Sequence, residues 1–190
     1  GNLGSSARAM QTMGLDTLAL VRPQGYPAGL ATAMASGAHD LLAAAPVLEQ
    51  MADALDGCRL ILGTSARGRS LALPRLGLRE AAALMLDEAA AGEVAVLFGQ
   101  ERIGLTNDQL ARCHYRVEIP ARPDFASLNL SQAVQLVAYE LRMAALAAAD
   151  ETTPASREAV HTPAPARELE GFFDHLEQTL YDIRFLHPTQ

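Results

Sequence analysis

Short apolar runs alternate along this chain with segments of helical periodicity, and this alternation constrains the fold more than any other feature. Each run is bounded by glycine, proline or charged residues; the runs are residues 17–21, 58–64, 93–99 and 114–120. Short runs rich in apolar residues are typical of strands buried in a parallel sheet. Strands alternating with helices predict an α/β fold, with a mostly parallel sheet flanked by helices.

The helical segments are recognised by apolar residues that recur every three or four positions. They are residues 5–13, 27–36, 47–55, 78–91 and 129–149. A further short helix is expected to begin after Thr106, because Thr106 and Gln109 have the spacing of a capping box.

The composition changes near residue 150 and suggests three parts. Residues 1–149 would form the main domain, and residues 150–167, with three prolines and little apolar content, are expected to be a linker. Residues 168–190 regain helical periodicity and would form a C-terminal helix that starts a truncated extension. The chain opens on a loop-to-helix turn, so the first strand is expected to precede residue 1.

The bulk composition describes a soluble, cytoplasmic globular protein. Hydrophobic residues make up 49% of the chain and charged residues 19%, and no apolar run is long enough to span a membrane. Cys58 and Cys113 have no partner at metal-ligand spacing, so they are interpreted as reduced core thiols, and no metal is expected.

The charge distribution leaves two interpretations of possible nucleic-acid binding. The net charge of −7 disfavours non-specific attraction to RNA. All fifteen basic residues, however, are arginines, which suit forked contacts to phosphate, and four of them lie close together. Arg67, Arg69, Arg75 and Arg79 form either an RNA-contacting segment or a solvated arginine-rich loop.

Three polar turns follow strands or precede helices, where open parallel sheets bind ligands. The first, residues 1–8, places Arg8 where it could hold a phosphate, although a plain surface arginine is the alternative. The second, residues 99–105, carries Glu101 between two glycines, and the third is Ser127-Leu128-Asn129. The glycine spacing of the first turn does not match a dinucleotide-binding fingerprint. The three turns are expected to converge on one crevice.

Taken in order, these turns resemble the three motifs of the SpoU branch of the SPOUT RNA methyltransferases. The motifs are Asn-x-Gly-x-x-x-Arg from Asn2, Gly-x-Glu-x-x-Gly-Leu from Gly99, and Ile-Pro at Ile119 followed by Ser-Leu-Asn. "GNLGSSARAMQTMGL" and "DFASLNLSQAVQLVAYELR" are most similar to the TrmJ-type tRNA (cytidine/uridine-2′-O)-methyltransferases. The resemblance covers the chain from its start to about Ala148.

The resemblance implies a deep trefoil knot in the C-terminal part of the α/β domain, a homodimer, and S-adenosylmethionine as cofactor. It also implies the residues that line the cofactor pocket: Thr64, Ser65, Ala66, Gly99, Ile119, Ser127, Leu128 and Asn129. The catalytic residues implied are Arg8, Asn2, Glu101 and Asn129. Arg8, Arg67, Arg69 and Arg75 are expected to contact RNA.

The implied reaction is methyl transfer to a ribose 2′-hydroxyl in the anticodon loop of tRNA. A guanidinium is a poor proton acceptor near neutral pH, so Arg8 is either perturbed by its site or clamps a substrate phosphate that takes the proton. The alternatives are a SpoU-type enzyme acting on ribosomal RNA and a non-catalytic, knotted RNA-binding dimer.

Overall fold

The structure is a computed structural model with two compact units, Gly1–Thr153 and Pro154–Gln190, which are treated separately below. The residues that it describes are 2–24, 37–65, 73–101, 103–122, 124, 127–150 and 164–187.

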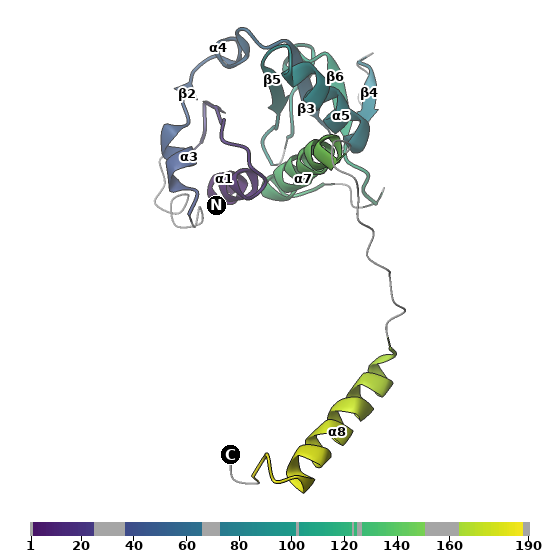
Figure 1. The fold of residues 1–190 in the computed structure, drawn as a ribbon. Coiled ribbons are helices and arrows are strands. Elements are labelled where there is room, and N and C mark those ends of the chain that lie inside the picture. The colour runs from purple at the N-terminus through teal and green to yellow at the C-terminus, as the bar shows by residue number, and fades with distance from the viewer. Residues whose placement is uncertain are drawn as a thin grey trace. The chain divides into compact units, whose positions relative to one another are not determined.

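The first unit is built on a four-stranded parallel sheet (Figure 1). Its strands are β3 (Leu60–Thr64), β4 (Arg75–Gly77), β5 (Val94–Leu97) and β6 (Tyr115–Glu118), in the order β4-β6-β3-β5. Leu62 lies beside Val96 on one side and Tyr115 on the other, and all three strand pairs are parallel. The prediction of a mostly parallel sheet is therefore confirmed.

Two long helices, α5 (Leu78–Ala89) and α7 (Leu130–Asp150), cover one face of this sheet. Leu62 of β3 is fully buried there and belongs to the same core cluster as Met85 of α5 and Val137 of α7. Both helices agree with their predicted segments.

The other face is covered by the short helix α6 (Asn107–Leu110) and its flanking residues. Successive strand residues point to opposite faces, so Gly63 points away from α5 and α7. A Cβ added at Gly63 would lie 2.8 Å from both Cys113 Sγ and Leu110 Cδ2, which shows how closely this layer packs. The Thr106 capping box is present, with Gln109 N donating to Thr106 Oγ1, and helices on both faces are confirmed.

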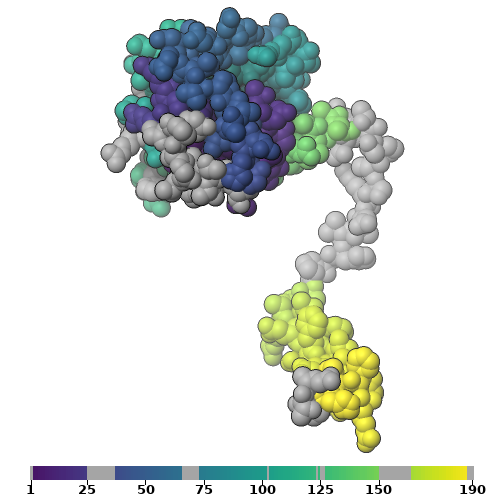
Figure 2. Space-filling model, turned by 90° about the vertical axis from the view of Figure 1, so that its left-hand side faces the viewer, coloured from purple at the N-terminus to yellow at the C-terminus, as the bar shows by residue number. Residues whose placement is uncertain are grey.

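The amino-terminal helix α1 (Asn2–Thr12) packs against α7 and α3 (His39–Ala44). Its contact with α3 forms a second core cluster that contains Ala7 and Leu41, and Figure 2 shows this face of the unit in purple and blue. The helix predicted for residues 5–13 is confirmed up to Thr12, but the turn expected before it is wrong, because the helix already begins at Asn2. The reason is packing, because Gly4 and Ala7 are small enough to be buried in the helix contact.

A small parallel pair joins β1 (Leu20–Val21) to β2 (Val47–Leu48). The predicted helix over residues 47–55 is therefore wrong in its first part, and only α4 (Met51–Leu55) is helical. Backbone bonds explain the difference, since Leu20 N donates to Pro46 O and Arg22 N donates to Leu48 O. The helix predicted for residues 27–36 lies outside the described residues.

The two cysteines differ in their surroundings. Cys113 is 7% exposed, and burial raises the pKa of its thiol to about 11, so it stays protonated near neutral pH. Cys58 is only half-buried, which corrects its assignment to the core; burial first, then Glu93 and Asp56, raise the pKa of its thiol. Among the described residues, no group of three or more His, Cys, Asp or Glu side chains could hold a metal ion.

The second unit contains α8 (Ala166–Asp182). Its apolar side chains repeat at helical spacing and are exposed; they include Leu169, Phe172, Phe173 and Leu176. The rings of Phe172 and Phe173 lie 5.6 Å apart in an edge-to-face arrangement. No helix in the described parts of the chain is long and apolar enough to cross a membrane.

Candidate active site

The carboxyl ends of β3, β5 and β6 lie side by side because these strands are parallel neighbours. Thr64 Oγ1 donates to Leu97 O at 2.9 Å, and Ser65 N donates to Val117 O at 3.1 Å. The chain that leaves β3 is thus bonded to the strand on each side. The side-chain hydroxyl of Thr64 is therefore used within the fold.

The turn after β5 folds back onto its own backbone at Gly99. A Cβ on Gly99 would lie 2.1 Å from the carbonyl carbon of Gly104 and 2.2 Å from Leu105 N. Gly104 N donates to Gln100 O at 2.7 Å, and Gly104 has a φ of 69°, a conformation that favours glycine. Both glycines of the motif are therefore needed for the shape of the turn. Glu101 is exposed within this turn.

The entrance of α7 is bonded directly to the start of α1. Asn129 Oδ1 accepts hydrogen bonds from Ser131 N at 2.9 Å and Ser131 Oγ at 2.7 Å. Asn129 Nδ2 donates to Asn2 Oδ1 at 3.0 Å, although the two residues are 127 positions apart. The first and third motifs therefore meet at this bond.

Arg8 lies on α1 with its side chain exposed, and no described residue forms an ion pair with it. Its carbonyl oxygen accepts from Thr12 Oγ1 at 2.8 Å, which is a contact within the helix. Because α1 begins at Asn2, Arg8 lies well inside the helix, beyond its first turn.

Three further residues that were predicted to line the cofactor pocket differ in how far they are buried. Ile119 packs against the main core cluster, Leu128 is half-buried, and Ser127 is exposed. Ala66, Arg67 and Arg69 lie outside the described residues.

Arg75 lies on the edge strand β4, and its Nη1 pairs with Glu118 Oε2 at 3.0 Å. Arg79 Nε pairs with Glu140 Oε2 at 3.3 Å. The side chains of both arginines are more than half exposed, and such surface pairs are weak, so a phosphate could compete for either arginine.

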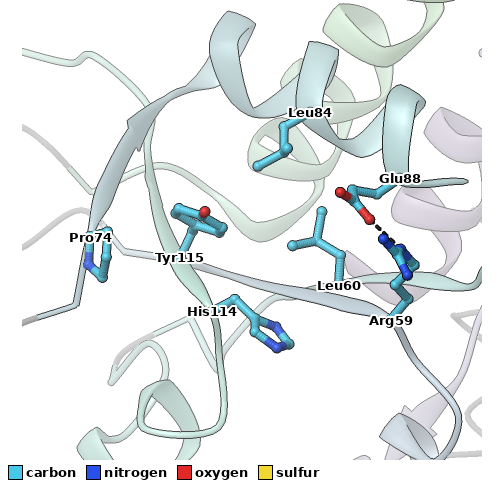
Figure 3. A pocket seen from close by; sticks show the side chains of 7 residues that line it. All are labelled: Arg59, Leu60, Pro74, Leu84, Glu88, His114 and Tyr115. Atoms are coloured by element: carbon cyan, nitrogen blue, oxygen red, sulfur yellow. Dashed lines mark hydrogen bonds and ion pairs between the residues drawn. The ribbon is translucent and has the colours of Figure 1, made fainter.

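A shallow hollow of about 510 Å³ lies at the opposite end of the sheet (Figure 3). It is lined by Leu60 and Tyr115, the first residues of β3 and β6, and by the ion pair of Arg59 with Glu88. None of the predicted site residues lines it. The hollow therefore does not coincide with the three motifs.

Sequence reasoning missed Ser131, which holds the Asn129 side chain. A signal was present, because Asn is a preferred residue just before a helix and commonly accepts from a backbone N–H two or three positions later. The notable feature is the additional bond from the Ser131 hydroxyl, which no spacing rule indicates.

Known proteins are similar to this chain in sequence and in fold. The family described as the SpoU rRNA Methylase family matches residues 1–139. The tRNA (cytidine/uridine-2′-O-)-methyltransferase TrmJ of Cronobacter sakazakii is 50% identical over 189 residues, which cover 99% of this chain and 77% of that protein.

Two solved structures are similar over nearly the whole chain. A probable methylase family protein from Haemophilus influenzae superposes with a TM-score of 0.75 at 42% identity, covering 99% of this chain and 77% of the other. TrmJ from Z. mobilis gives a TM-score of 0.71 at 36% identity, with coverages of 99% and 78%. Together with the motifs on the carboxyl edge and at the entrance of α7, these matches show that the chain belongs to the SpoU methylase family.

Proposed function

We propose that this protein is a cytoplasmic methyltransferase that uses S-adenosylmethionine to methylate the ribose 2′-hydroxyl of a cytidine or uridine in the anticodon loop of tRNA. The observation that carries the proposal is the bond between Asn2 and Asn129, which brings two of the three family motifs together. The 50% identity to a TrmJ enzyme over nearly the full chain supports the choice of tRNA and of pyrimidine ribose.

The residues at the carboxyl edge fit S-adenosylmethionine. Thr64, Ser65 and Gly99 are small, and the two turns that they begin are held by bonds within the fold, so their backbone groups can approach adenine and ribose closely. Ile119 and Leu128 would add apolar contact. When bound, the cofactor supplies a methyl group on a sulfonium, which is already a good leaving group, so the proposed chemistry needs no metal.

The chain's own residues have to align the hydroxyl and provide for its proton. We assign Arg8 to a substrate phosphate, because its exposed guanidinium can donate two parallel bonds. The clamped phosphate would lie next to the hydroxyl and take its proton. Asn2, Glu101 and Asn129 would shape the site around the ribose.

The family resemblance also implies a C-terminal trefoil knot and a homodimer, and both are part of the proposal. An exposed apolar stripe on α7 supports the dimer: Leu136, Tyr139, Met143 and Leu146 are between 38% and 46% exposed. Their spacing of three or four positions places them along one side of the helix. A second copy of the chain would cover this stripe.

The arginine segment is assigned to the RNA backbone, and this assignment predicts a change in salt dependence. An Arg67→Ala/Arg69→Ala double variant should bind tRNA with a shallower slope of log affinity against log salt, by about one to two units for two lost phosphate contacts. Filter binding over a range of salt concentrations would measure the slope. An unchanged slope would remove these arginines from the RNA interface.

The proposed reaction is tested by incubating the protein with radiolabelled S-adenosylmethionine and total tRNA. Digestion and nucleoside analysis should show label in 2′-O-methylcytidine or 2′-O-methyluridine. Parallel incubation with ribosomal RNA gives the control for substrate class. Label in ribosomal RNA alone would contradict the assignment to tRNA, and RNA binding without label in either would favour a non-catalytic role.

A further inference from the structure

We infer that Ser131 is a positioning residue for the reaction, because it fixes the direction of a hydrogen-bond chain from Ser131 through Asn129 to Asn2. This inference rests on the proposed function. It adds a residue that none of the three motifs contains. It also assigns a donor or acceptor role to each side-chain amide group of Asn129 and Asn2.

The direction of the chain follows from the one group whose polarity is certain. The backbone N–H of Ser131 can only donate, and it lies 2.9 Å from a side-chain atom of Asn129. That atom must therefore be the amide oxygen, which also accepts from Ser131 Oγ at 2.7 Å. The NH₂ group of Asn129 then has to face Asn2, which must present its own oxygen, as the 3.0 Å contact shows.

This hydrogen-bond chain leaves the NH₂ group of Asn2 available to a substrate. Its oxygen is used by Asn129, and no described residue accepts from its nitrogen. An amide NH₂ can donate to a phosphate or ribose oxygen, both of which RNA carries next to the reacting hydroxyl. If the side-chain amide of Asn129 flipped by 180°, the side-chain amide of Asn2 would have to flip as well. Asn2 would then present its oxygen, instead of its NH₂ group, to the phosphate and ribose oxygens of the RNA.

The Ser131 N–H sets this orientation, and the Ser131 hydroxyl donates a second hydrogen bond to the same oxygen, which restrains the Asn129 side chain. Ser131→Ala keeps the backbone N–H and removes the hydroxyl, and we expect kcat to fall about 5- to 10-fold, as the loss of one hydrogen bond of about 1 kcal/mol implies. The KM for S-adenosylmethionine should stay within about twofold. Ser131→Thr retains the hydroxyl and should restore kcat. Gln132→Ala, an exposed neighbour on α7, is the matched control.

A double-mutant cycle with Asn129→Asp separates orientation from stability. A carboxylate at residue 129 has two equivalent oxygens, and either can accept from Ser131. The side chain at residue 129 then has no amide whose orientation could matter, but the Ser131 hydroxyl can still donate to it. Ser131→Ala should therefore lower the Tm in both backgrounds but lower kcat only when residue 129 is Asn. An equal loss of kcat in both backgrounds, or no loss with Asn129 present, would overturn the inference.

The same four proteins should also be compared by their Kd for tRNA, which does not require turnover. We expect Ser131→Ala to weaken tRNA binding about threefold when Asn129 is present and to leave it unchanged in the Asn129→Asp background. Wild-type protein that methylates no RNA would overturn the proposed function, and the Kd cycle would then decide on the hydrogen-bond chain alone. Wild-type activity combined with an unaffected Ser131→Ala variant would overturn only the role of Ser131.

Discussion

Arg8→Ala is expected to abolish methyl transfer to tRNA, with a loss of kcat greater than about 100-fold, while the affinity for S-adenosylmethionine stays within a few-fold. The guanidinium is exposed on α1, no described residue pairs with it, and we assign it to the substrate phosphate. Removing a charged donor that acts on the reacting group typically has an effect of this size on catalysis.

The measurement should combine single-turnover methylation with calorimetric binding of S-adenosylhomocysteine. Arg8→Lys retains the charge but loses the two-pronged donor, so it should recover only a small part of the activity. Arg112→Ala removes an exposed arginine that lies just after α6 and should behave as wild type. If Arg8→Ala also eliminates cofactor binding, the assignment of Arg8 to substrate phosphate is wrong.

Gly99→Ala is expected to have the second large effect, through the shape of the turn after β5. The added Cβ would lie within 2.5 Å of three backbone atoms of Gly104 and Leu105, and backbone cannot rotate away as a side chain can. The turn would have to open, at a cost of about 1–3 kcal/mol, as expected for overpacking. Cofactor affinity should fall at least tenfold, since this turn forms one wall of the proposed pocket.

Thermal unfolding and calorimetric binding of S-adenosylhomocysteine would measure the two effects of Gly99→Ala. Gly171→Ala is the control, because nothing lies within 4 Å of a Cβ at that helical position in α8. It should leave cofactor affinity unchanged. A Gly99→Ala protein with wild-type affinity would mean that the turn is not part of the pocket.

The two central strands of the sheet could be predicted from sequence, β3 because Leu60, Ile61 and Leu62 form a continuous apolar run and β6 because Tyr115 and Val117 alternate with charged residues. The same reasoning missed β4, since Arg75–Gly77 has little strand character and becomes a strand only by pairing with β6. It also assigned Val47–Leu48 to a helix, because two residues cannot show a period and their pairing with β1 depends on distant backbone.

The motifs predict which residues form the site, but they could not show how those residues are held. The pattern around Gly99 indicated a turn, whereas the approach of Gly104 to the Gly99 α-carbon is visible only in coordinates. Similarly, Asn2 and Asn129 were both predicted as site residues, but their mutual bond, and the part played by Ser131, depend on how α1 packs against α7.

The bond between Asn2 and Asn129 also has a consequence for biosynthesis. Helix α1 is synthesised before α7, against which it packs, and more than a hundred residues separate the two helices. Contacts so distant along the chain form slowly, since a long loop must close first. Nascent chains that stop before α7 therefore lack the Asn2–Asn129 bond and cannot assemble this part of the proposed site.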